Sequence, residues 1–182
     1  MENKNLGGKF EDINKIYTIM KKLIVSLVLL CAAFSFVNAQ DASSLPRAAR
    51  IAYNWLSEEG YRPYIDEDGD VSFKAQGYYF YISVHESDPN YLQLVMPGIK
   101  TIDMDADDAI VATYCALAAC NEMTRDKKLV KAYMTDSGKV SLTCETYLDD
   151  SPLVGDYLET AIDFIIRVNG QWRESYNELM ED

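Results

Sequence analysis

The chain has 182 residues with 29 acidic and 17 basic side chains, one histidine and four cysteines, and its formal net charge is −12. This length favours one domain, and a hydrophobic fraction of 48% is enough to form a core. The acidic balance argues against a nucleic-acid binder, which needs clustered lysine and arginine. One histidine excludes a metal site built from several histidines.

The sequence from Met20 has the three parts of a secretory signal peptide. Lys21 and Lys22 form the positive start, residues 23–34 form an apolar run, and Ala39 ends a stretch with small side chains. A membrane anchor is the competing interpretation, but it needs about 20 apolar residues, and this run is shorter. We therefore expect cleavage after Ala39 and a periplasmic or secreted product that does not insert into the membrane.

The domain organisation follows from this signal. Residues 1–39 are interpreted as an N-terminal extension plus the signal peptide, and the start at Met20 leaves open whether residues 1–19 are translated. Residues 40–182 are expected to form a single domain. This domain is more acidic than the whole chain, because the removed segment carries more basic than acidic residues.

The expected domain keeps an odd number of cysteines, Cys115, Cys120 and Cys144, although export implies an oxidising compartment. Cys115 and Cys120 are five residues apart in a predicted helix, so they lie on different faces and do not pair with each other. Either Cys144 pairs with Cys115 or Cys120, or all three are small buried apolar residues. Their spacing does not match a zinc site, and we predict no metal and no cofactor.

The first half of the domain predicts one helix followed by four strands. The helix over residues 47–59 has apolar side chains at helical spacing and ends before Gly60. An Asp-Gly turn joins the first two strands. Pro97 and Gly98 predict a loop after the fourth strand. The four strands are expected over residues 61–66, 71–76, 78–86 and 91–96.

The second half predicts a helix, a hairpin and a long terminal helix. The middle helix covers about residues 106–124 and follows a run of aspartates, which suit a helix N-terminus. Strands over residues 129–134 and 140–148 flank a Ser-Gly turn. Residues 153–179 have the period of an amphipathic helix, with Gly170 as its weak point. The predicted order is α-ββββ-α-ββ-α, an α+β fold.

Several turns and helix ends form a characteristic set. Its members are Trp55-Leu56, Gly60-Tyr61, the turn Asp66-Glu67-Asp68-Gly69, Ala119-Cys120-Asn121-Glu122-Met123 and Ser137-Gly138-Lys139-Val140. The set resembles the YbjN-like family of bacterial sensory-transduction regulators. Two features depart from the family pattern: Thr124 stands where a second asparagine is common, and the sequence predicts a signal peptide.

The resemblance to the YbjN-like family implies the fold of type III secretion chaperones. In that fold, helices pack mainly on one face of a twisted antiparallel sheet. The resemblance also implies a small acidic protein that binds other proteins or peptides, often as a homodimer. It supplies no catalytic residues.

The third predicted strand contains a candidate binding surface. Phe80 and Ile82 alternate with Tyr79, Tyr81 and, further on, His85. If the first set faces the helices, then Tyr79, Tyr81 and His85 face away from them. Tyrosine side chains there would make a contact surface that loses little freedom on binding. The alternative is that the terminal helix or a loop covers them.

The terminal helix is a second candidate contact. With 1.5 Å of rise per residue it would be roughly 40 Å long, which is longer than a domain of this size requires. Its distal residues Trp172, Tyr176 and Leu179 are therefore expected to pack on a second copy. A kink at Gly170 that returns this end to its own sheet is the alternative.

The sequence lacks a catalytic motif. No nucleophile and acid accompany His85 at a recognisable spacing, and the glycine of the acidic turn 66–70 comes too early for a calcium loop. The favoured interpretation is an exported, non-enzymatic module that binds a protein or peptide, with a basic partner suited to its charge. An extended peptide along a strand edge is the expected mode. The alternatives are a periplasmic structural accessory or inhibitor within a complex, and a hydrolase with paired carboxylates.

Overall fold

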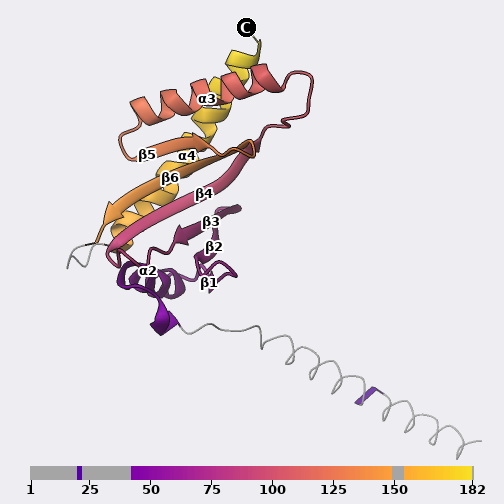
Figure 1. Cartoon of the computed structure of the whole chain (residues 1–182). Helices are drawn as coiled ribbons and strands as arrows, with labels where there is room; N and C mark the ends of the chain where they lie inside the picture. The colour runs from indigo at the N-terminus through magenta and orange to yellow at the C-terminus, as the bar shows by residue number, and fades with distance from the viewer. Residues whose placement is uncertain (1–19, 22–41, 149–153, 182) are drawn as a thin grey trace, which may run out of the picture. The chain divides into compact units, whose positions relative to one another are not determined.

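A computed structural model describes residues 20–21, 42–148 and 154–181 (Figure 1). The predicted cleavage site after Ala39 and most of the signal peptide lie outside the described residues. The chain divides into Met1–Ala39 and a compact unit, Gln40–Asp182, which contains all the described strands. Among the described residues, no helix combines the length and the apolar character needed to cross a membrane.

The described elements follow the predicted order, with one short 3-10 helix added at the start. The helices are η1 (Ala42–Ser44), α2 (Arg47–Glu58), α3 (Ala109–Asp126) and α4 (Val154–Glu181). The strands are β1 (Tyr64–Ile65), β2 (Val71–Ala75), β3 (Tyr78–Ser83), β4 (Tyr91–Thr101), β5 (Val130–Met134) and β6 (Lys139–Tyr147). The α-ββββ-α-ββ-α prediction is confirmed.

The six strands form one antiparallel sheet in the order β1-β2-β3-β4-β6-β5. The tight turn between β2 and β3 explains part of this meander. Gln76 and Gly77 both have positive φ, 50° and 84°, which is the backbone of a two-residue hairpin turn that suits the strand twist. The Gln76 side chain also donates a hydrogen bond of 2.6 Å to Asp163 on α4. The hairpin is thereby tied to the terminal helix.

Strand β4 is longer than the sequence suggested. We expected it to end before Pro97 and Gly98, but it pairs with β6 on both sides of these residues. The pairing register shifts between Met96 and Lys100, and Gly98 has a φ of 61°. Such an irregularity accommodates proline and glycine within a strand. The loop prediction was therefore wrong, because these two residues form a local distortion of the strand.

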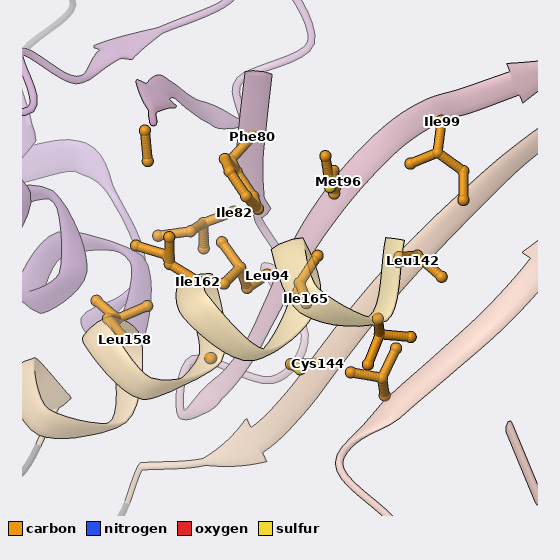
Figure 2. Packing of buried hydrophobic residues seen from close by; sticks show 14 of the residues in the cluster. Phe80, Ile82, Leu94, Met96, Ile99, Leu142, Cys144, Leu158, Ile162 and Ile165 are labelled. Atoms are coloured by element: carbon orange, nitrogen blue, oxygen red, sulfur yellow. The ribbon is translucent and has the colours of Figure 1, made fainter. Parts of the chain in front are cut away.

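The core lies between one face of the sheet and helices α2 and α4. Figure 2 shows Leu158, Ile162 and Ile165 of α4 against strand side chains such as Phe80 and Leu142. These side chains are all nearly or fully buried. Helix α3 extends this layer along β5 and packs on α4. The prediction of helices mainly on one face of a twisted antiparallel sheet is confirmed.

The structure corrects the role expected for the distal part of α4. Trp172 is fully buried in its own domain, and Tyr176 is 7% exposed. Their rings stack with centroids 5.2 Å apart and an interplanar angle of 11°. Leu179 is partly buried against the same core. Gly170 does not interrupt α4, so this end reaches its own core without a break, and Trp172 and Tyr176 do not offer a surface to a second copy.

The three cysteines after Ala39 are buried as separate thiols. Cys115 donates a hydrogen bond of 3.3 Å to the carbonyl oxygen of Leu179. Burial raises the pKa of the Cys144 thiol to about 12, which makes its reactive thiolate form rare at neutral pH. Neither of the disulfides considered from the sequence is present, and the three side chains act as small buried residues.

Two glycines of α4 are expected to respond oppositely to alanine. A Cβ at Gly155 would lie 2.4 Å from Nε1 of Trp55, whereas one at Gly170 meets nothing within 4 Å. Gly155→Ala should lower the free energy of unfolding by about 1–3 kcal/mol, because the Trp55 ring must move. Gly170→Ala should raise it by about 0.5–1 kcal/mol, because alanine is the better helix former. Urea unfolding followed by circular dichroism measures both changes, and changes of the same sign would contradict this packing.

Candidate binding face

The sheet has a second face, which looks away from α2 and α4. In Figure 1, α4 passes behind the strands, and the opposite face is turned towards the viewer. One row of Cα partners crosses all six strands and so identifies this face: Tyr64, Ser72, Tyr81, Val95, Thr143 and Lys131. Side chains two residues away along each strand lie on the same face.

Six tyrosines gather on this face. They come from five of the six strands and are Tyr64, Tyr79, Tyr81, Tyr91, Tyr133 and Tyr147. We call this set the tyrosine face. Tyr147 is 68% exposed and Tyr64 is 52% exposed, whereas Val95 and Thr143, on the same side of the sheet, are at most 2% exposed. Because no described helix packs on this side, the larger side chains around Val95 and Thr143 must account for their burial, and the tyrosine rings form the outer surface.

A hydrogen-bonded chain holds Tyr79 in place. Its hydroxyl lies 2.5 Å from Oγ of Ser72, which in turn donates to Oδ2 of Asp66 at 2.6 Å. The other oxygen of Asp66 accepts the backbone N–H groups of Asp68 and Asp70 at 3.1 and 3.0 Å. The acidic turn between β1 and β2 therefore uses a carboxylate to brace the turn and, through Ser72, to orient Tyr79.

Two tyrosines interact across the middle of the face. Tyr81 lies on β3 and Tyr133 on β5, with β4 and β6 between them. Burial, followed by the interaction with the Tyr133 hydroxyl, raises the pKa of Tyr81 to about 12. The interaction with Tyr133 requires the two side chains to lean over the intervening strands. The Tyr81 phenol therefore stays protonated well above physiological pH.

His85 lies just after β3, at one end of a row of aromatic side chains. Its ring centroid is 4.9 Å from that of Tyr91, in a T-shaped contact. Tyr91 then packs on Tyr147, with centroids 5.3 Å apart. Aromatic pairs at such distances contribute about 0.5–1.5 kcal/mol beyond their burial. The sequence placed His85 beside Tyr79 and Tyr81, whereas the structure places it against Tyr91.

A polar network runs beside this aromatic row. Nε2 of His85 lies 3.3 Å from Oε1 of Gln93, and the Gln93 amide donates to Glu145 at 3.3 Å. Lys131 donates to the other carboxylate oxygen of Glu145 at 2.5 Å. Burial and the Glu145 carboxylate together raise the pKa of Tyr91 to about 12. The network links the end of β3 to β4, β6 and β5, so this part of the face is internally braced.

Glu145 should make this bracing depend on pH. Burial favours a raised pKa for its carboxyl, but hydrogen bonds from Lys131, Tyr91 and Gln93 outweigh burial and hold the pKa below its ordinary value of 4.5. A lowered folded-state pKa contributes stability that is present above the unfolded-state pKa and is lost as the pH falls through the folded-state pKa.

Glu145→Gln should therefore lose less stability than the unchanged protein between about pH 5 and pH 3. Urea midpoints measured across this range test the prediction. Glu178→Gln changes an exposed carboxylate on α4 and should keep the slope of the unchanged protein. An equal slope for Glu145→Gln would show that the Lys131–Glu145 pair does not stabilise the fold.

The sequence identified only part of this surface. Tyr79 and Tyr81 alternate with buried neighbours in β3, and the structure places both on the face without helices. Tyr64, Tyr91, Tyr133 and Tyr147 were missed. Each of them also alternates with more buried neighbours in its strand, but their meeting depends on the pairing of β4 with β6. That pairing joins segments about 50 residues apart, and the sequence pattern did not reveal it.

The strand edges are less available than expected. Edge strand β1 has only two residues. On edge strand β5, the Thr124 hydroxyl donates to the carbonyl oxygen of Ala132 at 3.2 Å and accepts the Ala132 N–H at 3.0 Å. Strand addition needs a row of unpaired backbone groups, and Thr124 occupies the middle of that row. The tyrosine face is therefore the better candidate surface.

The described residues do not form a recognisable catalytic centre. His85 contacts the Gln93 amide and the Tyr91 ring, and no group of three potential metal ligands is found in the described part of the chain. A cavity of about 410 Å³ beside the start of α2 contains two carboxylates, Asp68 and Glu86. This cavity is partly open to solvent, whereas catalysis with paired carboxylates benefits from a site that excludes water.

Comparisons with known proteins support the fold only. No family model and no curated protein matches the chain. An uncharacterised protein from Methanothermobacter thermautotrophicus has a similar structure, with a TM-score of 0.52 at 13% sequence identity. The match covers 72% of this chain and 97% of the archaeal chain. The Yersinia pestis type III secretion chaperone SycH, solved with a fragment of YscM2, gives a TM-score of 0.46 at 9% identity and coverage of 69% and 98%. The chain shares the α+β fold of the archaeal protein.

Proposed function

We propose that the chain is an exported, non-enzymatic binding module of the YbjN-like kind, which holds an extended basic segment of a partner protein across the tyrosine face. The observation that carries this proposal is the set of exposed tyrosine rings on a sheet face without helices. Tyrosine is enriched at protein interfaces. It supplies a large contact area and has few torsions to immobilise on binding.

The bracing of the face supports a binding role. Tyr79 is held through Ser72, Tyr81 interacts with Tyr133, and Tyr91 interacts with Glu145. Side chains that are already ordered lose less conformational entropy when a partner binds. The face can therefore bind a flexible segment with most of the entropy cost on the partner's side.

Charge favours a basic partner. The whole chain carries a net charge of −12, and acidic side chains flank the face at its turns. Asp66 and Asp70 lie between β1 and β2, and Asp88 lies between β3 and β4 and interacts with Tyr147. Complementary charge raises the association rate and disfavours acidic competitors. A segment that carries lysine or arginine between apolar residues fits both the charge and the rings.

Export is the second part of the proposal and rests on the N-terminal signal. The lysines and apolar run after Met20 would direct the chain out of the cytoplasm, and signal peptidase would cleave after Ala39. The partner is then a periplasmic or secreted protein. N-terminal sequencing of the exported product should begin at Gln40, and recovery of the uncleaved chain in the cytoplasm would contradict this location.

Selection from a random-peptide display library tests the binding specificity. Residues 40–182 contain the complete described core and would serve as the bait. We expect enrichment of peptides in which basic residues alternate with apolar ones, and their affinity should fall as salt is added, because ionic strength screens surface charge. Enrichment of acidic peptides, or of none, would contradict a basic segment as the ligand.

A further inference from the structure

The cavity of about 410 Å³ beside the start of α2 combines two kinds of side chain. Its lining comes from three places in the chain: the residues before α2, the acidic turn between β1 and β2, and the residues after β3. Four apolar residues and two carboxylates contribute to it, namely Leu45, Pro46, Ile65 and Val84 with Asp68 and Glu86. We call it the acidic cavity. Its volume lies in the range of about 300–1,000 Å³ that is typical of small-ligand sites.

The walls of the acidic cavity are held in place by the fold. Ile65 and Val84 pack against the hydrophobic core. The Val84 N–H donates a hydrogen bond of 2.7 Å to Oδ1 of Asp70, which joins the end of β3 to the acidic turn. The Ala48 N–H donates to the carbonyl oxygen of Pro89 at 2.8 Å, which ties the start of α2 to the loop after β3. A site that is already formed loses less entropy when it binds a ligand.

Charge indicates the kind of ligand that the acidic cavity accepts. Asp68 and Glu86 are exposed, and neither forms an ion pair with another residue in the described part of the chain. Burial raises the pKa of the neighbouring Asp70 carboxyl, and the Asp66 and Asp68 carboxylates raise it further, because like charges repel. A bound cation would relieve this crowding of negative charge.

The start of α2 does not reverse this preference. The N-terminus of a helix carries about half a positive elementary charge, and Pro46, the residue before α2, lines the cavity. The Ala48 N–H in the first turn is already bonded to Pro89. Asp68 and Glu86 each carry a full negative charge when ionised, so the acidic cavity keeps a net negative charge.

We propose that the acidic cavity binds a primary alkylammonium group. The alkyl chain lies against Ile65 and Val84, and the carboxylates of Asp68 and Glu86 hold the ammonium. An inorganic cation would gain nothing from the apolar wall, whereas a chain of methylenes is stabilised by leaving water. This chemistry has two sources, a free aliphatic amine and the lysine side chain of a partner. The site is separate from the tyrosine face, because Ile65 and Tyr64 are adjacent in β1 and point to opposite faces of the sheet.

Titration with straight-chain amines, followed by nuclear magnetic resonance of backbone amides, tests this site. Residues 40–182 contain the complete described core and would be titrated with ethylamine, butylamine and hexylamine. We expect shifts for the amides of Leu45, Gly69 and Val84, and an affinity that rises by about 2–4-fold for each added methylene that reaches the wall. Unchanged amides at these positions, or an affinity independent of chain length, would overturn the proposal.

Removal of the two carboxylates tests their role. Asp68→Asn with Glu86→Gln keeps the shape of both side chains and should weaken hexylamine binding by at least about 10-fold, because hydrogen bonds to charged groups are lost. Glu67→Gln with Glu178→Gln is the matched control, since it removes the same charge from exposed positions that do not line the cavity. It should keep the affinity. Equal losses in the two double variants, both folded by circular dichroism, would show that hexylamine binds only to the general negative charge.

Two further probes distinguish the sources of the ammonium group. Cadaverine represents a free aliphatic amine, and Nα-acetyl-lysine methylamide represents a lysine side chain within a protein. Tighter binding of cadaverine would assign the acidic cavity to a free amine, and tighter binding of the blocked lysine would assign it to a partner protein. Binding of neither probe would overturn the proposal. Tyr147→Ser should leave both affinities unchanged, whereas a loss would contradict the separation of this site from the tyrosine face.

Discussion

Trp172→Ala is expected to lower the free energy of unfolding by about 3–5 kcal/mol, which is the range for removal of a buried large aromatic side chain. The indole is fully buried, and it stacks on Tyr176 with centroids 5.2 Å apart. Alanine would leave a cavity beside α4 that neighbouring side chains fill only in part. Urea unfolding followed by circular dichroism measures the loss.

Trp172→Phe is the matched control. It keeps a ring against Tyr176, so it should cost clearly less than Trp172→Ala. Near-normal stability for Trp172→Ala would contradict the packing of Trp172 inside its own domain.

A triple substitution of the most exposed part of the tyrosine face is expected to weaken binding of a selected basic peptide by at least about 100-fold. The three changes are Tyr64→Ser, Tyr133→Ser and Tyr147→Ser. These side chains are 52%, 38% and 68% exposed, so the free energy of unfolding should fall by no more than about 1–2 kcal/mol. Isothermal titration calorimetry measures the affinity, and urea unfolding measures the stability.

Tyr114→Ser is the matched control for this triple variant. Tyr114 is 71% exposed, which is close to the exposure of Tyr147, but it lies on α3 outside the tyrosine face. Its replacement should leave the peptide affinity unchanged. Equal losses from Tyr114→Ser and the triple variant would indicate unspecific contact with exposed aromatic rings. Unchanged affinity in the triple variant would show that the peptide binds elsewhere.

Local signals were sufficient to predict most of the fold. The hairpins are specified by short turns, such as Gln76-Gly77 with its two positive φ values. The helices were predicted from the spacing of their apolar residues and from residues that end a helix, such as Gly60. The course of β4 through Pro97 and Gly98 could not be predicted in this way. The distortion there is stabilised by pairing with β6, more than 40 residues further along the chain, and a strand without its partner has no reason to continue through proline and glycine.

From the sequence, members of the tyrosine face could be predicted only one strand at a time. Alternation in β3 identified Tyr79 and Tyr81. The meeting of Tyr133 with Tyr81 depends on the sheet order β3-β4-β6-β5. In the same way, periodicity identified Trp172 as part of an apolar stripe on α4 but not what covers it. The exposure of Ile110, Val111, Tyr114 and Leu117 on α3 was not predicted, because apolar residues occur on both sides of that helix and only one side is buried.

Nuclear magnetic resonance of the complex with a selected basic peptide tests the central claim most directly. Resonances of tyrosine rings, selectively labelled in residues 40–182, report which rings the peptide contacts. The account predicts shifts for rings of the tyrosine face, largest for Tyr64, Tyr133 and Tyr147, and none for Tyr114 on α3. Shifts confined to Tyr114, or binding without any change in the rings of the tyrosine face, would contradict it.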